Sequence, residues 1–398
     1  MKTRLLLVND DLRFGGVETA LFSLLNQLDP EAFDIEVCLF NCADTSLLSS
    51  LPDHVRVWSP KGGKRKSDGA YYKLLLLLLK AEEKLCPPGW EKRADRLMAK
   101  IYRLLYDEAA RHVEQERFDV AVGFKQGAAS QFVTEPFVHA ARRVVFFRHG
   151  EINHPNLYPP IFARADEVIT ISGGMLDMLK ARYPEAAAKM SVIENHVPYL
   201  DIQQKARALA VARPQGRLML ASSGRFSEEK GFLLAVRAAK RLKEHGLSFL
   251  WVFIGDGYQR PELEREIAAL GLSGDIEITG YQKNPFPYVA ACDIFVQPSR
   301  VEALGNTIVE AQVLLKPVVA TRTLGALSLI REGENGALAD FDPESLADAI
   351  LALARDPEAR ERMRRALKTV DYGEKNAASL KSYCRLFTLN GPQGEARG

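Results

Sequence analysis

Residues 299–310 have the sequence SRVEALGNTIVE, and this stretch predicts a ligand site at the end of a strand. The preceding run, residues 293–298 (DIFVQP), is typical of a buried parallel strand. The segment from Thr307 to Leu315 has the apolar spacing of a helix. Glu302 and Glu310 therefore flank a glycine loop at a strand-to-helix turn, and such turns lie at the carboxyl edge of α/β sheets, where ligands bind.

This turn suits a ligand that contains phosphate. Gly305, Asn306 and Thr307 stand where the expected helix begins, and helix starts offer unpaired N–H groups and positive potential to anions. The separation of Glu302 and Glu310 corresponds to up to about 12 Å along a helix. One carboxylate can thus hold sugar hydroxyls and the other ribose hydroxyls, on either side of a diphosphate. The alternative interpretation is one surface glutamate and one helix-face glutamate.

Two further segments have the same strand–turn–helix character. Residues 223–231 (SGRFSEEKG) follow the apolar run 218–221 and precede a helical pattern that starts at Phe232. Arg225 and Lys230 can converge there on one anionic group, because guanidinium geometry matches phosphate. The alternatives are a solvated lysine and an arginine that caps a carbonyl. Residues 251–257 (WVFIGDG) form a third strand end with a tight glycine turn.

With these segments in this order, the chain resembles the retaining glycosyltransferases of family 4, also called group 1 glycosyltransferases, which have the GT-B fold. The resemblance covers roughly residues 217–352 and is looser at Gly15-Gly16-Val17-Glu18 and from Ser172 to Asn195. The matching motifs in the second half are the Glu302/Glu310 pair, Gly224-Arg225 with Lys230-Gly231, Gly255-Asp256-Gly257, Gly280-Tyr281, Pro298-Ser299 and Gly333-Glu334-Asn335-Gly336.

The fold that this resemblance implies is an α/β GT-B fold, with two doubly wound Rossmann-like domains facing each other across a cleft. Apolar runs that alternate with helical patterns support it. We expect an N-terminal acceptor-side domain over residues 1–198, a connection over 199–216 and a nucleotide-sugar-binding domain over 217–372. Residues 373–398 would form a C-terminal helix that packs back on the N-terminal domain, followed by a tail.

Short apolar runs and helical patterns also place the elements of the first half. The expected strands are Leu5–Val8, Ile35–Phe40, Val55–Val57, Val120–Phe124, Arg143–Phe147, Glu167–Ile171 and Ser191–Glu194. The expected helices are Val17–Leu28, Tyr72–Leu85, Lys92–Glu116 and Gly174–Arg182.

The N-terminal half contributes fewer site candidates. Gly15 and Gly16 separate the first strand from the first helix, where a backbone without side chains can approach a substrate or phosphate closely. His149 follows an expected strand, and the resemblance implies a histidine of the first domain near the donor sugar. His154 is the alternative choice, and an exposed loop histidine is the alternative interpretation of His149.

A metal site is not expected. Asp340-Phe341-Asp342 has the Asp-x-Asp spacing that binds a divalent metal in another glycosyltransferase fold, but Pro343 follows directly. Asp342 is therefore better interpreted as a helix N-cap, with Pro343 at the first helical position. Without an acidic metal cluster, Arg225, Lys230 and backbone N–H groups would stabilise the leaving group, and no cofactor would be required.

The function implied is a retaining, hexosyltransferase-type glycosyltransferase in cell-envelope polysaccharide or glycolipid assembly. It would move a sugar from a nucleotide-diphosphate sugar, with UDP favoured, to a hydroxyl of a glycan or lipid-linked acceptor. Glu302 would hold the sugar, Glu310 the ribose, and Arg225 with Lys230 the diphosphate; Gly224 and Gly255 would border the nucleotide. The alternatives are a nucleotide-sugar epimerase on the same scaffold and a non-catalytic nucleotide-sugar-binding protein.

The composition indicates which partners the protein can bind and where in the cell it is expected to act. A net charge of +2 over 398 residues implies no general affinity for nucleic acid. The five cysteines are scattered, which favours reduced thiols and a cytoplasmic location, and the short run Leu5–Val8 is an expected core strand rather than a signal peptide. Residues 61–103 carry twelve Lys or Arg against five Asp or Glu, interleaved with six leucines from Leu74 to Leu79. This segment predicts peripheral contact with an anionic membrane surface, with an ordinary solvated or core segment as the alternative.

Overall fold

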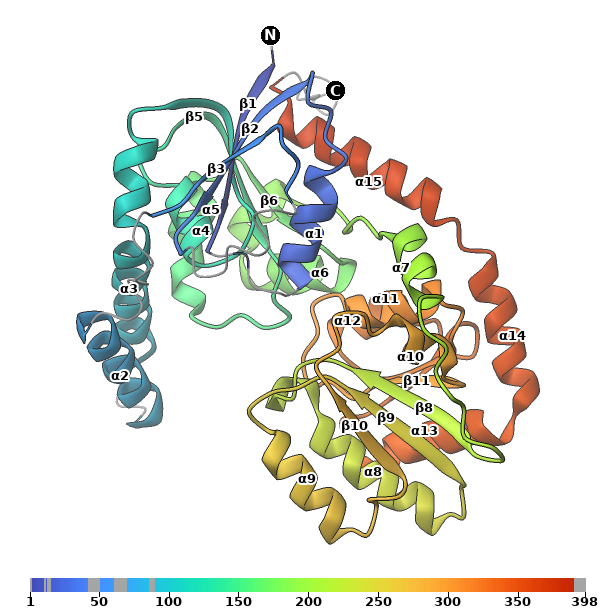
Figure 1. Ribbon diagram of the computed structural model, residues 1–398. Coiled ribbons are helices and arrows are strands. Elements are labelled where there is room, and N and C mark those ends of the chain that lie inside the picture. Colours follow the sequence, from blue (N-terminus) through green and yellow to red (C-terminus); the bar gives the residue numbers. More distant parts are fainter. Residues whose placement is uncertain are drawn as a thin grey trace. The chain divides into compact units, whose positions relative to one another are not determined.

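The computed structural model of this chain describes residues 2–10, 12, 16–41, 51–60, 70–85 and 90–389. Gly15, the basic residues 61–69, Cys42, Cys86 and the tail from residue 390 lie outside these ranges. The chain divides into two compact units. The first comprises Met1–His196 with Gly373–Gly398, and the second comprises Val197–Tyr372 (Figure 1).

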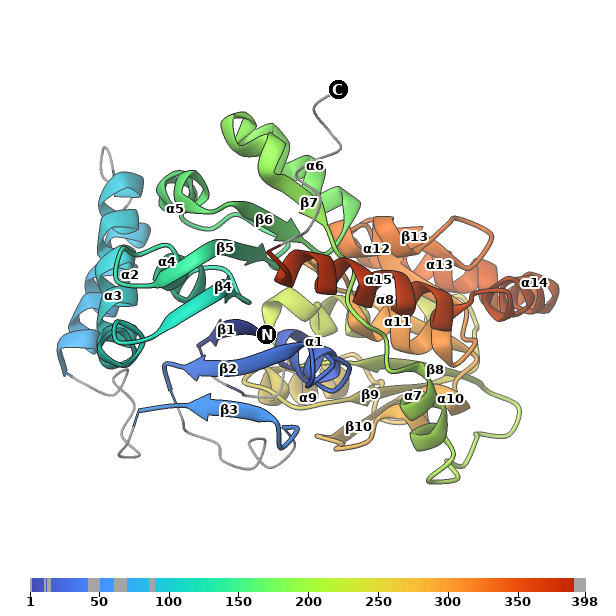
Figure 2. The same cartoon turned by 90° about the horizontal axis from the view of Figure 1, so that it is seen from above.

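The first unit is built on a seven-stranded parallel sheet in the order β3-β2-β1-β4-β5-β6-β7, seen with its strands side by side in Figure 2. Its strands are β1 (Thr3–Asn9), β2 (Phe33–Leu39), β3 (Val55–Trp58), β4 (Arg117–Gly123), β5 (His139–Phe147), β6 (Glu167–Thr170) and β7 (Met190–Val192). Its helices are α1 (Gly16–Leu25), α2 (Ala70–Leu85), α3 (Trp90–Val113), α4 (Ala128–Val133), α5 (Tyr158–Arg164), α6 (Gly173–Arg182) and α15 (Tyr372–Phe387), with short 3-10 turns at Pro155–Leu157 and Pro184–Lys189.

The core of the first unit forms around β1, because its apolar residues are buried on both faces of the sheet. Leu5 pairs with Ile35 of β2 on one side and with Val120 of β4 on the other. The helix α15 covers part of this core, where Phe387 meets Phe33 edge to face at 6.4 Å between ring centroids. Each such buried side chain contributes about 1.5–3 kcal/mol, so α15 is an integral part of the first unit.

The second unit has a six-stranded parallel sheet in the order β10-β9-β8-β11-β12-β13, which is the arrangement of a doubly wound Rossmann-like domain. Its strands are β8 (Leu218–Ser223), β9 (Phe249–Ile254), β10 (Ile276–Gly280), β11 (Ile294–Gln297), β12 (Val318–Thr321) and β13 (Gly336–Ala339). Its helices are α7 (Tyr199–Ala206), α8 (Phe232–Glu244), α9 (Arg260–Ala269), α10 (Phe286–Ala291), α11 (Asn306–Val313), α12 (Leu324–Leu329), α13 (Pro343–Arg355) and α14 (Pro357–Lys368), with a 3-10 turn at Glu228–Lys230.

Two core clusters cover the two faces of this second sheet. One gathers side chains of α8, α9 and α13 around Trp251, and the other gathers side chains of α11 and α12 around Phe295. Within the stretch expected to connect the domains, the helix α7 forms instead, and its buried Ile202 packs with Val309 and Val313 of α11. A helix with one buried apolar residue has little periodicity, so the sequence pattern gave no sign of it.

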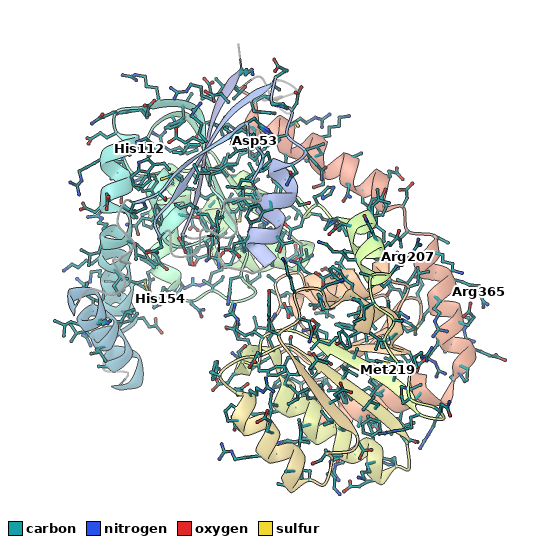
Figure 3. The ribbon with its side chains drawn as sticks, in the orientation of Figure 1. Asp53, His112, His154, Arg207, Met219 and Arg365 are labelled. Atoms are coloured by element: carbon teal, nitrogen blue, oxygen red, sulfur yellow. The ribbon has the colours of Figure 1, made fainter. Side chains whose placement is uncertain are left out.

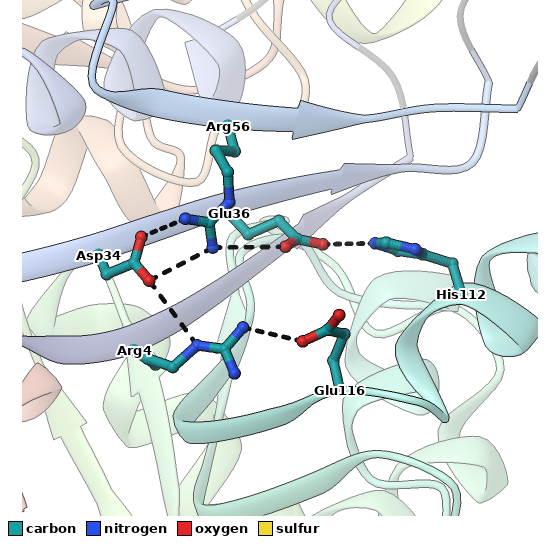
Figure 4. Close-up of polar contacts among 6 residues, drawn as sticks. All are labelled: Arg4, Asp34, Glu36, Arg56, His112 and Glu116. Atoms are coloured by element: carbon teal, nitrogen blue, oxygen red, sulfur yellow. Dashed lines mark hydrogen bonds and ion pairs between the residues drawn. The ribbon is translucent and has the colours of Figure 1, made fainter.

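A chain of charged groups ties the first strands of the first unit to α3 (Figure 4). Arg56 donates to Asp34 at 2.5 Å, which raises the pKa of Arg56, and it lies 3.7 Å from the buried Glu36. His112 of α3 contacts the other oxygen of Glu36 at 2.7 Å. Arg4 extends the chain, 3.7 Å from Asp34 and 2.9 Å from Glu116. Because Arg4 and Asp34 stand near the starts of their strands, this network stabilises the amino end of the sheet, away from its carboxyl edge.

Candidate functional site

The expected site segments of the second unit meet at one edge of its sheet. The strands β8 and β11 are neighbours, and the chain leaves them toward opposite flanks of the sheet. This switch point is where doubly wound sheets bind ligands, outside the carboxyl ends of the strands. Residues 224–230 follow β8 and residues 298–305 follow β11, so the sheet order brings together segments about seventy residues apart in the sequence.

Glu302 lies at the centre of this edge. Its Oε1 accepts hydrogen bonds from Lys230 Nζ at 2.5 Å, from Ser299 Oγ at 2.9 Å and from Gln297 Nε2 at 3.2 Å. The side chain of Glu302 is only 11% exposed, and that of Lys230 is 28% exposed. Three donors on one oxygen fix the orientation of the carboxylate and leave Oε2 free of those three contacts.

A second layer of hydrogen bonds orients these donors. Thr307 Oγ1 donates to Gln297 Oε1 at 2.6 Å, so the amide nitrogen of Gln297 points to Ser299 and Glu302. Thr321 Oγ1 donates to the carbonyl oxygen of Ser299. Sequence reasoning missed Gln297 and Thr321; the available signal was an amide at the end of an otherwise apolar strand.

Two glycines allow the loops at this edge to pack backbone to backbone. Gly231 has a φ of +67°, and a Cβ at this position would lie 1.9 Å from the carbonyl oxygen of Pro298. A Cβ on Gly255 would lie 1.9 Å from the carbonyl oxygen of Gly224. The glycines after β8 and β9 thus bring three strand-end loops together, and Gly231 holds the Lys230 loop against the loop that carries Glu302.

The helix α11 begins at this edge. Gly305 is its N-cap in the left-handed conformation, with a φ of 83°, and Asn306 and Thr307 are its first two residues. The first N–H groups of a helix have no acceptor within the helix, so α11 presents an anion-binding end. The hydroxyl of Thr307 is engaged by Gln297, which leaves backbone N–H groups as the donors available to a ligand.

Glu310 lies in the second turn of α11. It is half-buried, and burial raises its pKa to about 7. Within the described part of the second unit, its carboxyl forms no hydrogen bond or ion pair. A carboxyl with such a raised pKa, near the ligand edge of a doubly wound sheet, marks a candidate binding residue.

The side chains of Arg225 and Lys230 differ in their exposure and in their partners. The side chain of Arg225 is exposed, whereas the neighbouring Phe226 is fully buried and anchors the loop. Lys230 contacts Glu302 and is the last residue of the short turn Glu228–Lys230. The structure therefore places both basic residues on the loop after β8 but pairs only Lys230 with an acid.

The first unit positions the two candidate histidines in unlike settings. His149 follows β5, is half-buried, and its Nδ1 lies 3.2 Å from both the N–H and the carbonyl oxygen of Glu151. His154, which is labelled in Figure 3, instead contacts the buried carboxylate of Asp95 at 3.0 Å. His149 is thus the better ligand-binding candidate. Gly16 opens α1, and Gly15 lies outside the described residues.

Next to His149 stands Arg148, which sequence reasoning also missed. Its guanidinium lies over the adjacent rings of Phe124 and Phe146, at 4.0 and 4.4 Å from their centroids, and burial lowers its pKa. It donates to Asn195 at 2.6 Å and to Tyr383 of α15 at 3.2 Å. A buried arginine in this setting fixes the chain at the carboxyl end of β5.

The aspartates near residue 340 act as the sequence predicts. Asp342 accepts a hydrogen bond from the Ser345 N–H at 3.0 Å and caps α13, which begins at Pro343. Asp340 pairs with Arg322 at 3.4 Å. Among the residues that the structure describes, no three His, Cys, Asp or Glu side chains are grouped as metal ligands.

Comparison with known proteins points to one family. Residues 205–370 match the family model described as "Glycosyl transferases group 1". The chain is 39% identical over 163 residues to the lipopolysaccharide core biosynthesis glycosyltransferase LpsE of Rhizobium meliloti, covering 39% of this chain and 47% of LpsE. It is 38% identical over 143 residues to the alpha-D-kanosaminyltransferase of Streptomyces kanamyceticus, covering 35% and 37%. The chain thus spans less than half the length of these two relatives.

Solved structures resemble nearly the whole chain. Anabaena Alr3699/HepE in complex with UDP-glucose has a TM-score of 0.67 at 20% identity, covering 96% of this chain and 99% of that one. The apo form of the lipopolysaccharide outer core galactosyltransferase WaaB has a TM-score of 0.62 at 16% identity, covering 96% and 100%. The chain has the GT-B fold. The predicted fold of two doubly wound α/β domains is therefore confirmed, and the family match supports the superfamily of group 1 glycosyltransferases.

Proposed function

We propose that this chain is a retaining family 4 glycosyltransferase that transfers a sugar from a nucleotide-diphosphate sugar, with UDP as the favoured carrier. The acceptor would be a hydroxyl of a glycan or lipid-linked molecule in cell-envelope polysaccharide or glycolipid assembly. The observation that carries the proposal is the oriented Glu302 carboxylate with Lys230, beside the start of α11 and the unpaired Glu310. All of these residues fall within the segment that matches the family.

The names of similar proteins support this choice of substrates. LpsE is named for lipopolysaccharide core biosynthesis, and one solved relative is described in complex with UDP-glucose. A Campylobacter jejuni relative, 27% identical over 211 residues, carries a name that specifies a diphospho-undecaprenol acceptor and N-acetylgalactosaminyl transfer. A nucleotide-sugar donor and a lipid-linked or glycan acceptor are consistent with these descriptions.

Each side chain has a role that follows from its surroundings. Bond cleavage at the anomeric carbon leaves negative charge on the diphosphate, which Arg225, Lys230 and the first N–H groups of α11 would stabilise. Lys230 would then bridge the diphosphate and Glu302. The remaining oxygen of Glu302 would accept hydrogen bonds from sugar hydroxyls, and His149 would form a hydrogen bond with another hydroxyl.

Retention would follow from attack on the face that the diphosphate leaves. The acceptor oxygen forms the new bond to the anomeric carbon while the old carbon–oxygen bond breaks, and a diphosphate oxygen takes the acceptor proton. A retaining glycosidase needs two carboxyls that flank one bond. Glu302 and Glu310 do not suit that arrangement, because Glu302 is held by three donors in the loop after β11 and Glu310 lies in the second turn of α11.

Calorimetry with UDP separates the roles of the two glutamates. We expect Glu310→Ala to weaken UDP binding, because the ribose would lose its acceptor, and Glu302→Ala to bind UDP normally but transfer sugar poorly. Glu262→Ala, at an exposed position on α9, controls for the loss of one carboxylate. Equal loss of UDP affinity in the Glu302 and Glu310 variants would overturn this assignment.

Membrane contact is part of the same proposal. Within the described residues, none of the helices combines the length and apolar character needed to cross a bilayer. However, α2 exposes Leu74, Leu77 and Leu78, which are 50%, 64% and 48% exposed and share one helix face. The basic residues Lys64, Arg65 and Lys66, predicted to contact anionic lipid, lie outside the described residues. The proposed location is cytoplasmic, at the inner face of the cell membrane.

Liposome flotation tests this surface. Leu77→Gln should reduce binding to anionic vesicles, because it removes the most exposed leucine of α2, and raising the salt concentration should weaken the remaining basic contribution. Leu209→Gln, at a leucine 56% exposed in the second unit, is the matched control. Absence of wild-type binding to anionic vesicles at low salt would refute the membrane proposal and favour a soluble acceptor.

A further inference from the structure

The first unit contains a pocket of about 530 Å³ that is lined by neither His149 nor His154, although its Lys92, Arg96 and Arg103 belong to the basic segment 61–103. It lies between the first half of α3, the end of α4 and the segment that runs through α5. Its size is within the range of small-molecule sites in proteins. Because all of its walls belong to the first unit, its shape does not depend on the second unit.

The helix α3 separates this pocket from α2. Ala94 and Ile101, with Leu97 and Met98, form the stripe of α3 that packs against the leucines of α2. The residues of α3 that line the pocket are spaced along the opposite stripe: Lys92, Asp95, Arg96, Ala99 and Arg103. One face of α3 is therefore used for packing, whereas the other, with three basic residues, faces an open space.

The acids in the pocket wall are already satisfied. Asp95 is 4% exposed and accepts hydrogen bonds from the Asn156 N–H and side-chain amide, at 3.2 and 2.7 Å, in addition to its contact with His154. Glu135 is 8% exposed, lies 3.5 Å from Arg103 and 3.9 Å from Arg164, and accepts from Tyr106 at 3.3 Å. Neither carboxylate needs a further cation.

The basic side chains outnumber these acids. Four of them line the pocket, namely Lys92, Arg96, Arg103 and Arg164, against the two carboxylates of Asp95 and Glu135. The side chains of Arg103 and Arg164 remain 68% and 54% exposed despite their contacts with Glu135. Apolar surface completes the wall, at Ala99, Leu157, Pro160 and Ile161.

We propose that this pocket binds the phosphate or diphosphate group of a ligand that also has an apolar portion. The excess positive charge selects an anion, and guanidinium groups match phosphate oxygens in geometry. The pocket is larger than a phosphate alone requires, and its apolar wall would contact the group esterified to that phosphate. The ligand can be a soluble phosphate ester or the head of a phosphorylated lipid, and the inference holds whether or not the second unit binds a nucleotide-sugar.

Isothermal titration calorimetry with two probes tests this proposal. Inorganic pyrophosphate supplies the charge alone, and dihexanoyl phosphatidic acid, used below its micelle concentration, supplies a phosphate with a short apolar portion. Both titrations include saturating UDP, so that binding to the proposed nucleotide site is not measured. We expect both probes to bind and the amphiphile to bind more tightly. Tighter binding of the amphiphile supports the proposed apolar portion and favours a lipid-headgroup source, and equal binding would contradict the proposal that the apolar wall contacts the ligand.

The decisive comparison uses two double variants on the same helix. Lys92→Gln with Arg96→Gln removes pocket charge without taking a partner from a buried acid, and should weaken both probes at least tenfold. Lys100→Gln with Arg111→Gln removes the same charge from exposed positions of α3 outside the pocket and should weaken them less than twofold.

The variant Ala99→Leu tests the cavity itself, because it narrows the pocket without changing its charge. It should weaken the amphiphile at least fivefold. Equal effects of the two double variants would show non-specific charge attraction and overturn the proposal, as would undetectable binding of both probes to wild-type protein at 5 mM. Loss of UDP binding in Glu310→Ala, measured separately, reports on the proposed function and leaves this test unaffected.

Discussion

Replacing Glu310 with glutamine should remove a pH dependence of stability that the buried carboxyl imposes. Burial raises its pKa from 4.5 to about 7. Between these values the folded protein keeps a proton that the unfolded chain has released, so the free energy of unfolding falls as pH rises. The loss begins near pH 4.5 and is complete above pH 7. The amide of Glu310→Gln does not ionise, so the variant avoids this loss.

The size of this change in the free energy of unfolding follows from the shift in the pKa of Glu310. A difference of one in pKa corresponds to about 1.4 kcal/mol, so ionisation of Glu310 destabilises the folded protein by up to about 3 kcal/mol. For a unit of this size, about 1 kcal/mol changes the Tm by roughly 2–4 °C. Between pH 5 and pH 8, wild-type protein should therefore lose on the order of 5–10 °C in Tm relative to Glu310→Gln.

Differential scanning calorimetry from pH 5 to pH 8 measures this difference. Glu262→Gln, at an exposed position on α9, is the control for removal of one carboxyl from the second unit. It should follow the wild-type pH profile. If the Tm values of wild type and Glu310→Gln fall in parallel across this range, the burial of Glu310 does not control its ionisation and the reasoning is wrong.

Three further predictions concern the site. Lys230→Ala should lower kcat by on the order of 100-fold, because a charge-stabilising donor at the diphosphate contributes about 2–3 kcal/mol; near-normal turnover would refute its role. Activity should persist in EDTA, and a loss that Mg²⁺ or Mn²⁺ restores would contradict the leaving-group chemistry proposed here. Gly231→Ala should destabilise the second unit by more than about 2 kcal/mol, through both its φ and the 1.9 Å approach to Pro298. Gly246→Ala, with a φ of +74° and open space around it, isolates the contribution of the close contact in Tm measurements.

Most strands of the fold could be predicted from sequence because parallel strands buried on both faces are continuous apolar runs. The run predicted as Leu5–Val8 is β1 at Thr3–Asn9, and that at Leu218–Ala221 is the first part of β8. The short helices were harder to find. The residues of α4 are all buried, so its six positions show no amphipathic period, whereas α7 buries only Ile202.

The sequence pattern also predicts the ends of helices only approximately. The apolar spacing predicts a helix to Leu315, but α11 ends at Val313. Leu315 adopts a φ of 59°, in the left-handed region that terminates helices. A leucine carries no signal for that conformation, which glycine or asparagine would have given. The helix end is closed by backbone hydrogen bonds from the N–H groups of Leu315 and Lys316 to the carbonyl oxygens of Gln312 and Ala311, both at 2.9 Å.

The pairing of Lys230 with Glu302 shows where sequence information about the site stops. The two residues lie 72 positions apart, and each belongs to a separate motif that predicts a phosphate or sugar contact. Their contact depends on β8 and β11 being neighbours, and on Gly231 letting one loop approach the other. Strand order is a property of the whole sheet, so the motifs could indicate which residues matter but not that they touch.

The two glutamates of the opening motif differ in a way that only the structure reveals. Glu302 Oε1 accepts three hydrogen bonds, so its carboxyl group is held in place before any ligand arrives. Glu310 accepts none from the described residues, and burial favours its protonated form. A ligand with hydroxyl donors would favour the ionised form of Glu310, so its binding should release a proton near neutral pH. Glu302 already has its donors, and a sugar bound there should not. Proton release on UDP binding, measured by calorimetry in buffers of different ionisation enthalpy, should therefore disappear in Glu310→Gln and persist in Glu302→Gln.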